Sequence, residues 1–362
     1  MGLSVGIAGL PNVGKSTLLN ALTHAGAEAS NYPFCTIDQN VGTAPVPDVD
    51  LQRLAEILQP QEVTPTTIRC VDIAGLVPGA SRGEGLGNRF LAHLRDVDLI
   101  LHVVRCFDDP NVAHSTATPD PVRDVGLVET EFLLADLEIA ERGVQKWSHA
   151  VRTGSPAAKE EVAAFERAVA GLRRGIPIGA LDLADKERAI LADCRFLTAK
   201  PCLYVANTGE ADPLGEGPGV AALRRALGAE CVLAVSVRIE AEIAELPPAE
   251  QRAFLAGMGL RETALDLVIA ACYRRLDLIT FYTIANEKLR AWQLPRGGTA
   301  VQAAGRIHTD MAAGFIRAEV LSLADLLEWK TRQALHDRGL VHTVGRDYVV
   351  RDKDVLQILF KA

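Results

Sequence analysis

Short apolar runs recur along the first two thirds of the chain and alternate with segments that repeat hydrophobic residues at helical spacing. Such runs, partly β-branched, are typical of buried strands. A strand followed by a helical repeat, several times over, predicts an α/β domain. The runs that we expect to form strands are Leu3–Ala8, Thr67–Val71, Leu99–Val104, Pro201–Ala206 and Val232–Ser236.

A different pattern begins near Leu127, where apolar residues keep a spacing of about 3.6 over a long stretch. Thr153–Pro156 interrupts it, with Ser155 as a candidate N-cap and Pro156 at a first helical position. Ala157–Leu172 then repeats the helical pattern. The sequence therefore predicts a two-helix protrusion inserted into the first domain, of a kind that often contacts partners.

The last part of the chain returns to strand-like patterns around one predicted helix, Thr299–Ile307. One helix over a small mixed sheet suggests a β-grasp-like module. The expected strands are Leu278–Thr283, Glu287–Trp292, Phe315–Val320, Tyr348–Val350 and Val355–Phe360. The predicted domains are 1–126 and 199–277 for the two parts of the first domain, 127–198 for the helical insertion and 278–362 for the C-terminal module.

Composition narrows the class of protein. The chain of 362 residues is 48% hydrophobic and 23% charged, as expected for a globular protein of two or three domains. No apolar run reaches the ~18 residues of a membrane span, and the N-terminus lacks a basic leader region. The seven cysteines contain no C-x-x-C pair, which favours reduced thiols and no zinc site. We expect a cytoplasmic protein with no membrane partner.

Charge is distributed unevenly. Residues 278–362 hold 12 Lys/Arg and 9 Asp/Glu, whereas the rest of the chain carries a net charge of −11. A basic end on an acidic protein suggests a polyanionic partner for that end. No RNA-recognition, KH or zinc-finger signature is present, and no DNA partner is expected.

Gly9–Ser16 fits the pattern G-x-x-x-x-G-K-[ST], and it lies between a predicted strand and a helix that starts near Thr17. This is the context that a phosphate-binding loop needs, because the glycines let backbone N–H groups converge on an anion. Lys15 adds a positive charge and the Ser16 hydroxyl can ligate Mg²⁺. The sequence therefore predicts a nucleotide site.

Two later segments look like the switches of such proteins. Thr36 ends a proline-containing loop, and a Thr there can meet both Mg²⁺ and the γ-phosphate. Asp72 ends a strand and Gly75 follows, which matches D-x-x-G; Asp72 would hold a Mg²⁺-bound water and the Gly75 N–H would sense the γ-phosphate. Leu76 occupies the position where Ras-like enzymes carry the Gln that orients water. Either another group positions water, or hydrolysis is slow unaided.

Asn207-Thr208-Gly209-Glu210 stands where GTPases carry N-K-x-D. Glu210 is one methylene longer than the Asp that accepts both guanine hydrogen bonds, and Thr208 replaces the Lys that covers the base. Guanine selectivity is therefore in doubt. The end of the next predicted strand, at Ser236, is expected beside the base.

Longer segments resemble the YchF/Obg-like ATPase family over essentially the whole chain. The residues that carry the resemblance are LPNVGKST at 10–17, NYPFCTI at 31–37, DIAGLVPGASRGEGLGN at 72–88, HVVRCF at 102–107, AGRIHTDMAAGFIRAEV at 304–320 and GRDYVVRDKDV at 345–355. The resemblance implies a P-loop domain, an inserted helical domain and a C-terminal TGS domain of β-grasp topology. It also implies Mg²⁺, a preference for ATP over GTP, and binding to ribosomes.

The resemblance also implies roles for single residues. Asn12 matches a loop Asn that helps to hold K⁺, Phe107 matches a residue of the base pocket, and His114 matches a loop His implicated in hydrolysis; by itself a loop His is usually solvated surface. The expected catalytic residues are Lys15, Gly75 and His114, and the expected metal ligands are Ser16, Thr36 and Asp72. The expected nucleotide contacts are Asn12, Val13, Gly14, Lys15, Ser16, Thr17, Phe107, Asn207, Thr208, Glu210 and Ser236.

Two other functions remain open at this point. One is a GTPase or an NTPase without base selectivity, which the relative turnover of ATP and GTP would reveal. The other is a binding module that uses ATP as a conformational ligand with negligible turnover. Leu76 keeps this second alternative open, and phosphate release with and without ribosomes would decide it.

Overall fold

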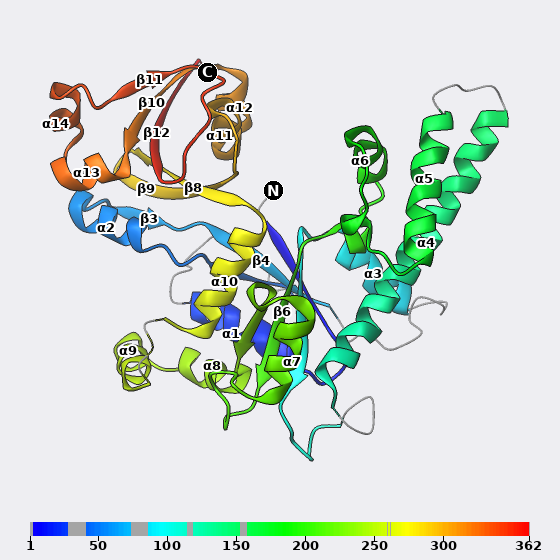
Figure 1. Cartoon of the computed structure of the whole chain (residues 1–362). Helices are drawn as coiled ribbons and strands as arrows, with labels where there is room; N and C mark the ends of the chain where they lie inside the picture. The colour runs from blue at the N-terminus through cyan, green and yellow to red at the C-terminus, as the bar shows by residue number, and fades with distance from the viewer. Residues whose placement is uncertain are drawn as a thin grey trace. The chain divides into compact units, whose positions relative to one another are not determined.

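The structure, a computed structural model, describes residues 3–27, 41–73, 86–113, 119–152, 158–258, 260 and 262–361. The chain divides into two compact units, each with its own sheet (Figure 1). The first unit comprises Met1–Ala44 and Arg69–Val268, and the second comprises Pro45–Ile68 and Ile269–Ala362.

The sheet of the first unit has the strand order β2-β4-β1-β5-β6-β7. From β4 to β7 every neighbouring pair is parallel, so the carboxyl ends of these strands share one edge. All five predicted strands of this region are confirmed. The strands are β1 (Ser4–Ala8), β2 (Val41–Pro45), β4 (Thr67–Asp72), β5 (Leu99–Cys106), β6 (Cys202–Thr208) and β7 (Val232–Val235).

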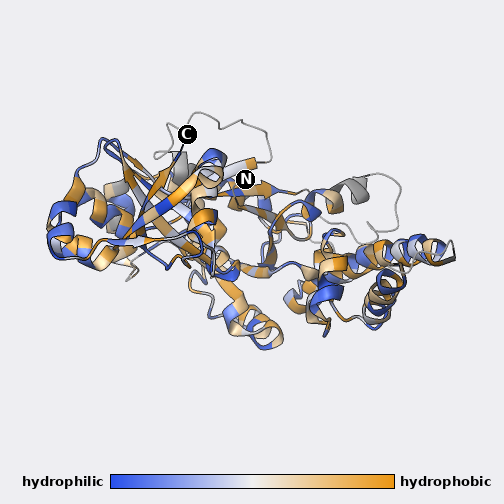
Figure 2. Ribbon diagram, turned by 90° about the horizontal axis from the view of Figure 1, so that it is seen from above, coloured by the Kyte–Doolittle hydropathy of each residue, from blue (hydrophilic) through white to orange (hydrophobic). Residues whose placement is uncertain are grey.

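Helices accompany the parallel strands, and their ribbons alternate hydrophobic and hydrophilic residues (Figure 2). The predicted helix after the glycine-rich loop is confirmed as α1, which begins at Lys15. The helices around this sheet are α1 (Lys15–Ala27), α3 (Leu86–Arg95), α7 (Pro218–Leu227), α8 (Val237–Ala244), α9 (Pro248–Gly257) and α10 (Ala264–Arg275), the last of which crosses into the second unit. Among the described residues, none of the helices combines the length and apolar character needed to cross a bilayer.

The predicted helical pair is present as α4 (Pro121–Arg152) and α5 (Ala158–Arg173). Small side chains let the two helices pack around Phe165 in a core of their own, which α6 (Asp185–Ala192) and nearby residues complete. α4 begins at Pro121, so it runs across the predicted boundary at 127. The predicted break at Ser155 and Pro156 lies outside the described residues.

Asp136, on α4, anchors the helical pair. Its carboxylate is fully buried and accepts from Arg95 Nη1, from the backbone N–H groups of Leu197 and Thr198, and from the Thr198 hydroxyl, at 2.8–3.0 Å. A buried carboxylate with this many donors fixes the groups around it, because leaving any of them unpaired is costly. The insertion is thus tied to α3 and to the chain that leads back to β6.

The second unit holds a mixed sheet in the order β11-β10-β12-β8-β9-β3. β8 pairs antiparallel with β9 and parallel with β12, and β3 pairs parallel with β9. The predicted strands at 278, 287, 315 and 355 are confirmed. The strands are β3 (Glu62–Thr64), β8 (Leu278–Ala285), β9 (Lys288–Pro295), β10 (Phe315–Ser322), β11 (His342–Val344) and β12 (Asp354–Phe360).

Tyr348–Val350, predicted as a strand, forms only an isolated bridge between Val349 and Thr299. The reason is its hydrogen bonding: the Tyr348 carbonyl accepts from Ala300 N, and Val350 N donates to the Gly298 carbonyl. The segment therefore braces the start of a helix. The predicted helix is confirmed as α11 (Ala300–Ile307). Three further short helices among the described residues accompany this sheet: α12 (Thr309–Ala313), α13 (Leu323–Trp329) and α14 (Arg332–Asp337).

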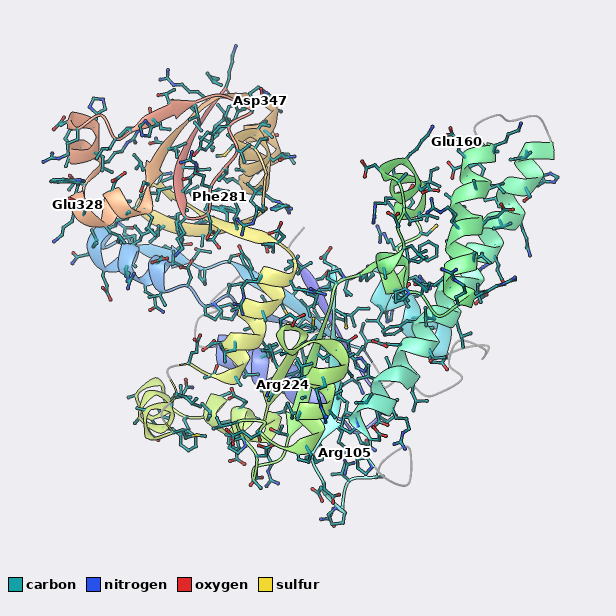
Figure 3. All side chains as sticks on the ribbon, in the orientation of Figure 1. Arg105, Glu160, Arg224, Phe281, Glu328 and Asp347 are labelled. Carbon is teal, nitrogen blue, oxygen red and sulfur yellow. The ribbon has the colours of Figure 1, made fainter. Side chains whose placement is uncertain are left out.

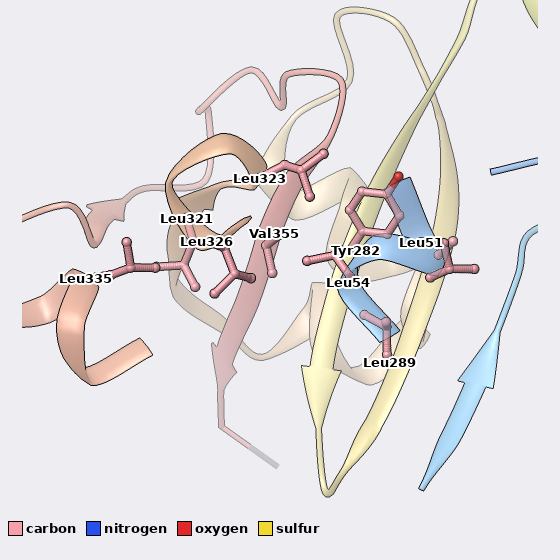
Figure 4. Close-up of a cluster of buried hydrophobic side chains, with 10 residues drawn as sticks. Leu51, Leu54, Tyr282, Leu289, Leu321, Leu323, Leu326, Leu335 and Val355 are labelled. Carbon is pink, nitrogen blue, oxygen red and sulfur yellow. The ribbon is translucent and has the colours of Figure 1, made fainter. Parts of the chain in front are cut away.

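Pro45–Ile68 belongs to the second unit, although the predicted first part of the nucleotide domain, 1–126, includes it. Leu51 and Leu54 of α2 (Val49–Leu58) are buried with Tyr282 and Leu289 in one hydrophobic cluster (Figure 4). The segment also adds β3 to the sheet of this unit. The predicted domain boundaries remain a proposal. We change it at one place, by assigning residues 45–68 to the same unit as the C-terminal module.

Candidate functional site

The loop between β1 and α1 has the backbone that its glycines predict. Gly9 and Gly14 adopt φ angles of 146° and 98°. A Cβ at Gly9 would lie 2.4 Å from the Val103 carbonyl oxygen, and one at Gly14 would lie 2.5 Å from Asn207 Nδ2. Only glycine combines a positive φ angle with so close an approach of neighbouring atoms. The two glycines therefore let the loop wrap tightly against the ends of β5 and β6.

Lys15 opens α1 with its side chain almost entirely enclosed, at 7% exposure. Its Nζ donates to the Leu10 carbonyl oxygen over 2.8 Å, which folds the side chain back along the loop. Burial lowers the pKa of Lys15, and the nearby charge of Asp72 opposes that change. A phosphate oxygen is a stronger, charged acceptor than a carbonyl, so Lys15 is placed to serve an anion at this loop.

Ser16 and Asp72 meet directly, as the predicted metal set requires. The Ser16 hydroxyl donates to Asp72 Oδ2 over 2.5 Å, and no described residue donates a hydrogen bond to the buried Asp72 Oδ1. A hydroxyl beside a carboxylate oxygen that lacks a donor is a suitable oxygen set for Mg²⁺. Elsewhere in the described residues, no group of three or more His, Cys, Asp or Glu side chains is arranged to hold a metal.

Asn207, at the end of β6, connects the phosphate loop to α8. Its Nδ2 donates to the Val13 carbonyl over 2.9 Å, and its Oδ1 accepts from Val237 N over 3.2 Å. Both groups of the amide are therefore occupied by the protein. Asn207 lines the pocket as predicted, and the contacts it makes here position the loop.

Thr208 and Ser236 are both buried, at 3% exposure, and neither hydroxyl has a hydrogen-bond partner within the described part of the chain. Thr208 lies at the pocket wall, whereas Ser236 precedes α8 and is not part of the lining formed by the described residues. The structure thus brings one of these two predicted contacts to the surface of the pocket.

These residues surround one open pocket of about 900 Å³. That volume falls in the range of small-molecule sites. It joins the phosphate loop to the ends of β5 and β6 and to the start of α8. The predicted residues that line it are Asn12, Gly14, Lys15, Ser16, Thr17, Phe107, Asn207, Thr208 and Glu210. Val13 contributes its carbonyl to Asn207 without lining the pocket.

Arg105, labelled in Figure 3, was not predicted as a site residue, yet it bonds to the segment that contains Phe107. It is 2% exposed, and its guanidinium donates to the carbonyl oxygens of Phe107, Asp109 and Val112 at 2.9–3.1 Å. The same group lies 4.5 Å from the centre of the Phe107 ring. The only sequence signal was an arginine near the end of an apolar strand. Arg105 thus holds the 107–112 loop against the pocket.

His102, three residues before Arg105 on β5, is buried in the core with 1% exposure. Burial, with a smaller contribution from Lys15, lowers its pKa to about 3. Its ring is therefore neutral at physiological pH.

Three predicted residues, Thr36, Gly75 and His114, lie outside the described residues, as does Leu76. The nearest described neighbour of His114 is Ala113, whose carbonyl accepts from Asn12 Nδ2 over 3.2 Å. Asn12 adopts a left-handed φ of 62° within the phosphate loop. The chain that leads to position 114 is therefore attached to that loop.

Comparison with known proteins agrees with this geometry. Residues 4–131 match a family model described as a 50S ribosome-binding GTPase, and residues 278–361 match a C-terminal domain of YchF GTPases described as of unknown function. The protein named "Ribosome-binding ATPase YchF" in Escherichia coli O157:H7 is 45% identical over 99% of both chains. The chain belongs to the YchF family.

Other members of the family extend the comparison. The Bacillus subtilis protein of the same name is 42% identical, covering 99% of this chain and all of that protein. The solved structure of the Schizosaccharomyces pombe YchF GTPase superposes with a TM-score of 0.88 at 33% identity, covering 99% of this chain and 98% of that one. The predicted α/β class, with a P-loop domain and a separate C-terminal domain, is thereby confirmed.

Proposed function

We propose that this protein is a Mg²⁺-dependent ATPase that prefers ATP to GTP and binds the ribosome under the control of its nucleotide. The observation that carries the proposal is one pocket with Lys15 and Ser16 at its phosphate end and Glu210, in place of an Asp, at its base end. The Ser16 hydroxyl joins Asp72 to the phosphate end. The relatives are named ribosome-binding ATPases, which supports ATP hydrolysis as the reaction and the ribosome as the partner.

The phosphate end has the charges and donors that a triphosphate requires. Lys15 would exchange the Leu10 carbonyl for phosphate oxygens, and the N-terminus of α1 would add its partial positive charge. Ser16 and Asp72, with Thr36, would hold Mg²⁺, which neutralises charge on the β- and γ-phosphates. The D-x-x-G pattern assigns the γ-phosphate contact to the Gly75 backbone, and the family resemblance assigns a role in hydrolysis to His114.

Two finer points belong to the same proposal. Asn12 is the candidate for holding K⁺ beside the phosphates, and its place on the phosphate loop supports this. Glu210, longer than Asp, is poorly suited to accept both guanine donors, which supports the preference for ATP. Phe107 would face the base from the wall that Arg105 holds.

The C-terminal module, proposed to be a TGS-type β-grasp domain, is our candidate for ribosome contact. Arginines bind phosphate oxygens well, and Arg306, Arg317 and Arg351 supply positive charge to this part of the chain. Arg290 and Arg296, also in the basic segment, form ion pairs with Glu62 and Asp277 at 3.1 and 2.8 Å. The exposed Arg317 and Arg351 are therefore better candidates than those two. A ribosomal partner would place the activity in the cytoplasm.

Phosphate release by the full-length protein tests the proposal, with ATP or GTP, with and without ribosomes, and with Mg²⁺ or EDTA. We expect turnover that needs Mg²⁺, is faster with ATP and rises with ribosomes. Equal turnover of the two nucleotides would support an unselective NTPase instead. Tight ATP binding with no release in any mixture would support a binding module, the alternative that Leu76 keeps open.

A further inference from the structure

Glu210 and Arg238 form an ion pair on the wall of the pocket that contains Lys15. Arg238 Nε lies 2.8 Å from Glu210 Oε1, and both residues line the pocket. Glu210 follows β6 and Arg238 is the second residue of α8. The amide of Asn207 bonds to the backbone of Val237, so the segments that carry the two charges are joined next to the pair.

The two purine bases differ in the donors and acceptors of their Watson–Crick edges. Guanine offers two adjacent donors, the N1–H and the 2-amino group, and a free carboxylate accepts both. Adenine offers its 6-amino donor beside N1, which is an acceptor. A carboxylate paired with a guanidinium presents an acceptor beside a donor, an order that the 6-amino group and N1 of adenine complement. Guanine meets the same order only with its N1–H and O6, so the pair takes from guanine the contact between a free carboxylate and its 2-amino group.

We propose that Arg238 is a specificity-determining residue that, by pairing with Glu210, lowers the affinity of this wall of the pocket for guanine relative to adenine. The inference rests on the proposed function, because it takes the pocket to be the nucleotide site. The side chains of Arg238 and Glu210 are 73% and 54% exposed, so a base can reach them and the effect is moderated by solvent.

Glu242 provides a matched control. It lies one turn further along α8 with its Oε1 3.6 Å from Arg238 Nε, and it is absent from the pocket lining formed by the described residues. Removing Glu242 changes the charge near Arg238 by one unit and leaves every residue of the described pocket lining in place. An effect of general electrostatics would therefore appear in Glu242→Ala, whereas an effect of the pair would not.

Calorimetry on the full-length protein with ADP and GDP tests the proposal, because these ligands carry the two bases and lack the γ-phosphate. Arg238→Ala should lower the ratio of the GDP to the ADP dissociation constant by about three- to tenfold, the scale of one solvent-exposed charged contact. Glu242→Ala should leave the ratio unchanged. In the Glu210→Ala background, Arg238→Ala should no longer shift it, because the partner is already gone.

Two outcomes would overturn the inference: an unchanged ratio in Arg238→Ala, or equal weakening of both ligands. If the alanine variant folds poorly, Arg238→Lys is measured instead, because lysine keeps the charge but lacks the planar guanidinium. It should shift the ratio of dissociation constants in the same direction by a smaller factor. An unchanged ratio in this variant would also contradict the inference. The wild-type ratio decides the proposed ATP preference separately, because the inference concerns only the change between variants.

Discussion

The side chain of Asn207 binds the carbonyl of Val13 over 2.9 Å, and so the last turn of the phosphate loop depends on a residue far along the chain. Asn207→Ala should loosen the loop and weaken binding of ATP and GTP alike, by about tenfold each, which corresponds to one buried hydrogen bond. Calorimetry with both nucleotides measures this. A change confined to one base would mean that Asn207 contacts the base and does not act through the loop.

Lys15→Ala should abolish hydrolysis and strongly weaken nucleotide binding. Its ammonium is the buried cation at the phosphate end of the described pocket, and its neighbour Ser16 contributes no charge. Phosphate release and calorimetry are the measurements, with Lys159→Ala on α5 as a control for the loss of one positive charge. Near-normal turnover in Lys15→Ala would remove the basis of the proposed function.

Arg105→Lys should weaken nucleotide binding while leaving the protein folded. Lysine keeps the positive charge but cannot donate to the carbonyls of Phe107, Asp109 and Val112 together. We expect an affinity loss of about three- to thirtyfold for ATP and GTP, with an unchanged far-ultraviolet circular dichroism spectrum. Wild-type affinity in the folded variant would show that the 107–112 loop keeps its position without the three hydrogen bonds of the Arg105 guanidinium.

His114→Ala should lower kcat with little change in ATP affinity, if the residue acts only in the transition state. Single-turnover phosphate release gives the rate, and calorimetry gives the affinity. His93→Ala, on α3, removes a histidine away from the pocket and serves as the control. An unchanged kcat would show that His114 has no role in hydrolysis and is an ordinary solvated loop residue.

Asp48 offers a test of how the 45–68 segment is held. It caps α2 by accepting from Leu51 N, and it accepts from the Tyr282 hydroxyl. Asp48→Ala should lower the free energy of unfolding by about 1–2 kcal/mol through loss of the cap. Asp48→Asn keeps an acceptor at both contacts, so it should be far milder in urea unfolding at neutral pH.

The same position predicts a pH dependence. Burial raises the pKa of Asp48 in the folded protein above its ordinary value of 3.8. The folded state then binds this proton more tightly than the unfolded state, so the group's contribution to stability falls as pH rises from about 4 through the raised pKa. Asn does not titrate, and Asp48→Asn should therefore gain stability relative to wild type between acid and neutral pH. A constant difference across that range would contradict the shift.

The phosphate loop and the strands around it could be predicted because their signals are local. Gly9, Gly14 and Lys15 stand in one run, and the apolar strands are continuous. Arg105 could not be assigned a role, since its partners are backbone carbonyls that carry no residue identity. The pair of Glu210 with Arg238 joins two separate elements, and only the path of the chain after β7 brings them together.

The C-terminal sheet shows the same division. β8, β9, β10 and β12 could be read from their own patterns, whereas Tyr348–Val350 has a strand-like composition and bonds to a helix start. α2 and β3 were missed as parts of this unit, because nothing local in Glu62–Thr64 indicates a parallel partner as distant as Lys288. Long-range pairing is decided by the packing of Leu51 and Leu54, which becomes visible only in three dimensions.

That pairing imposes an order on synthesis. Gln61 and Glu287, hydrogen-bonded neighbours in the finished protein, are 226 positions apart, so a ribosome adding ~5–20 residues per second makes the second roughly 10–45 s after the first. Throughout that delay the nascent chain carries Leu51 and Leu54 without their later cover of Tyr282 and Leu289. The apolar face of α2 therefore stays exposed until β8 and β9 have been synthesised. A chain truncated before these strands would leave that face permanently exposed to chaperones and proteases.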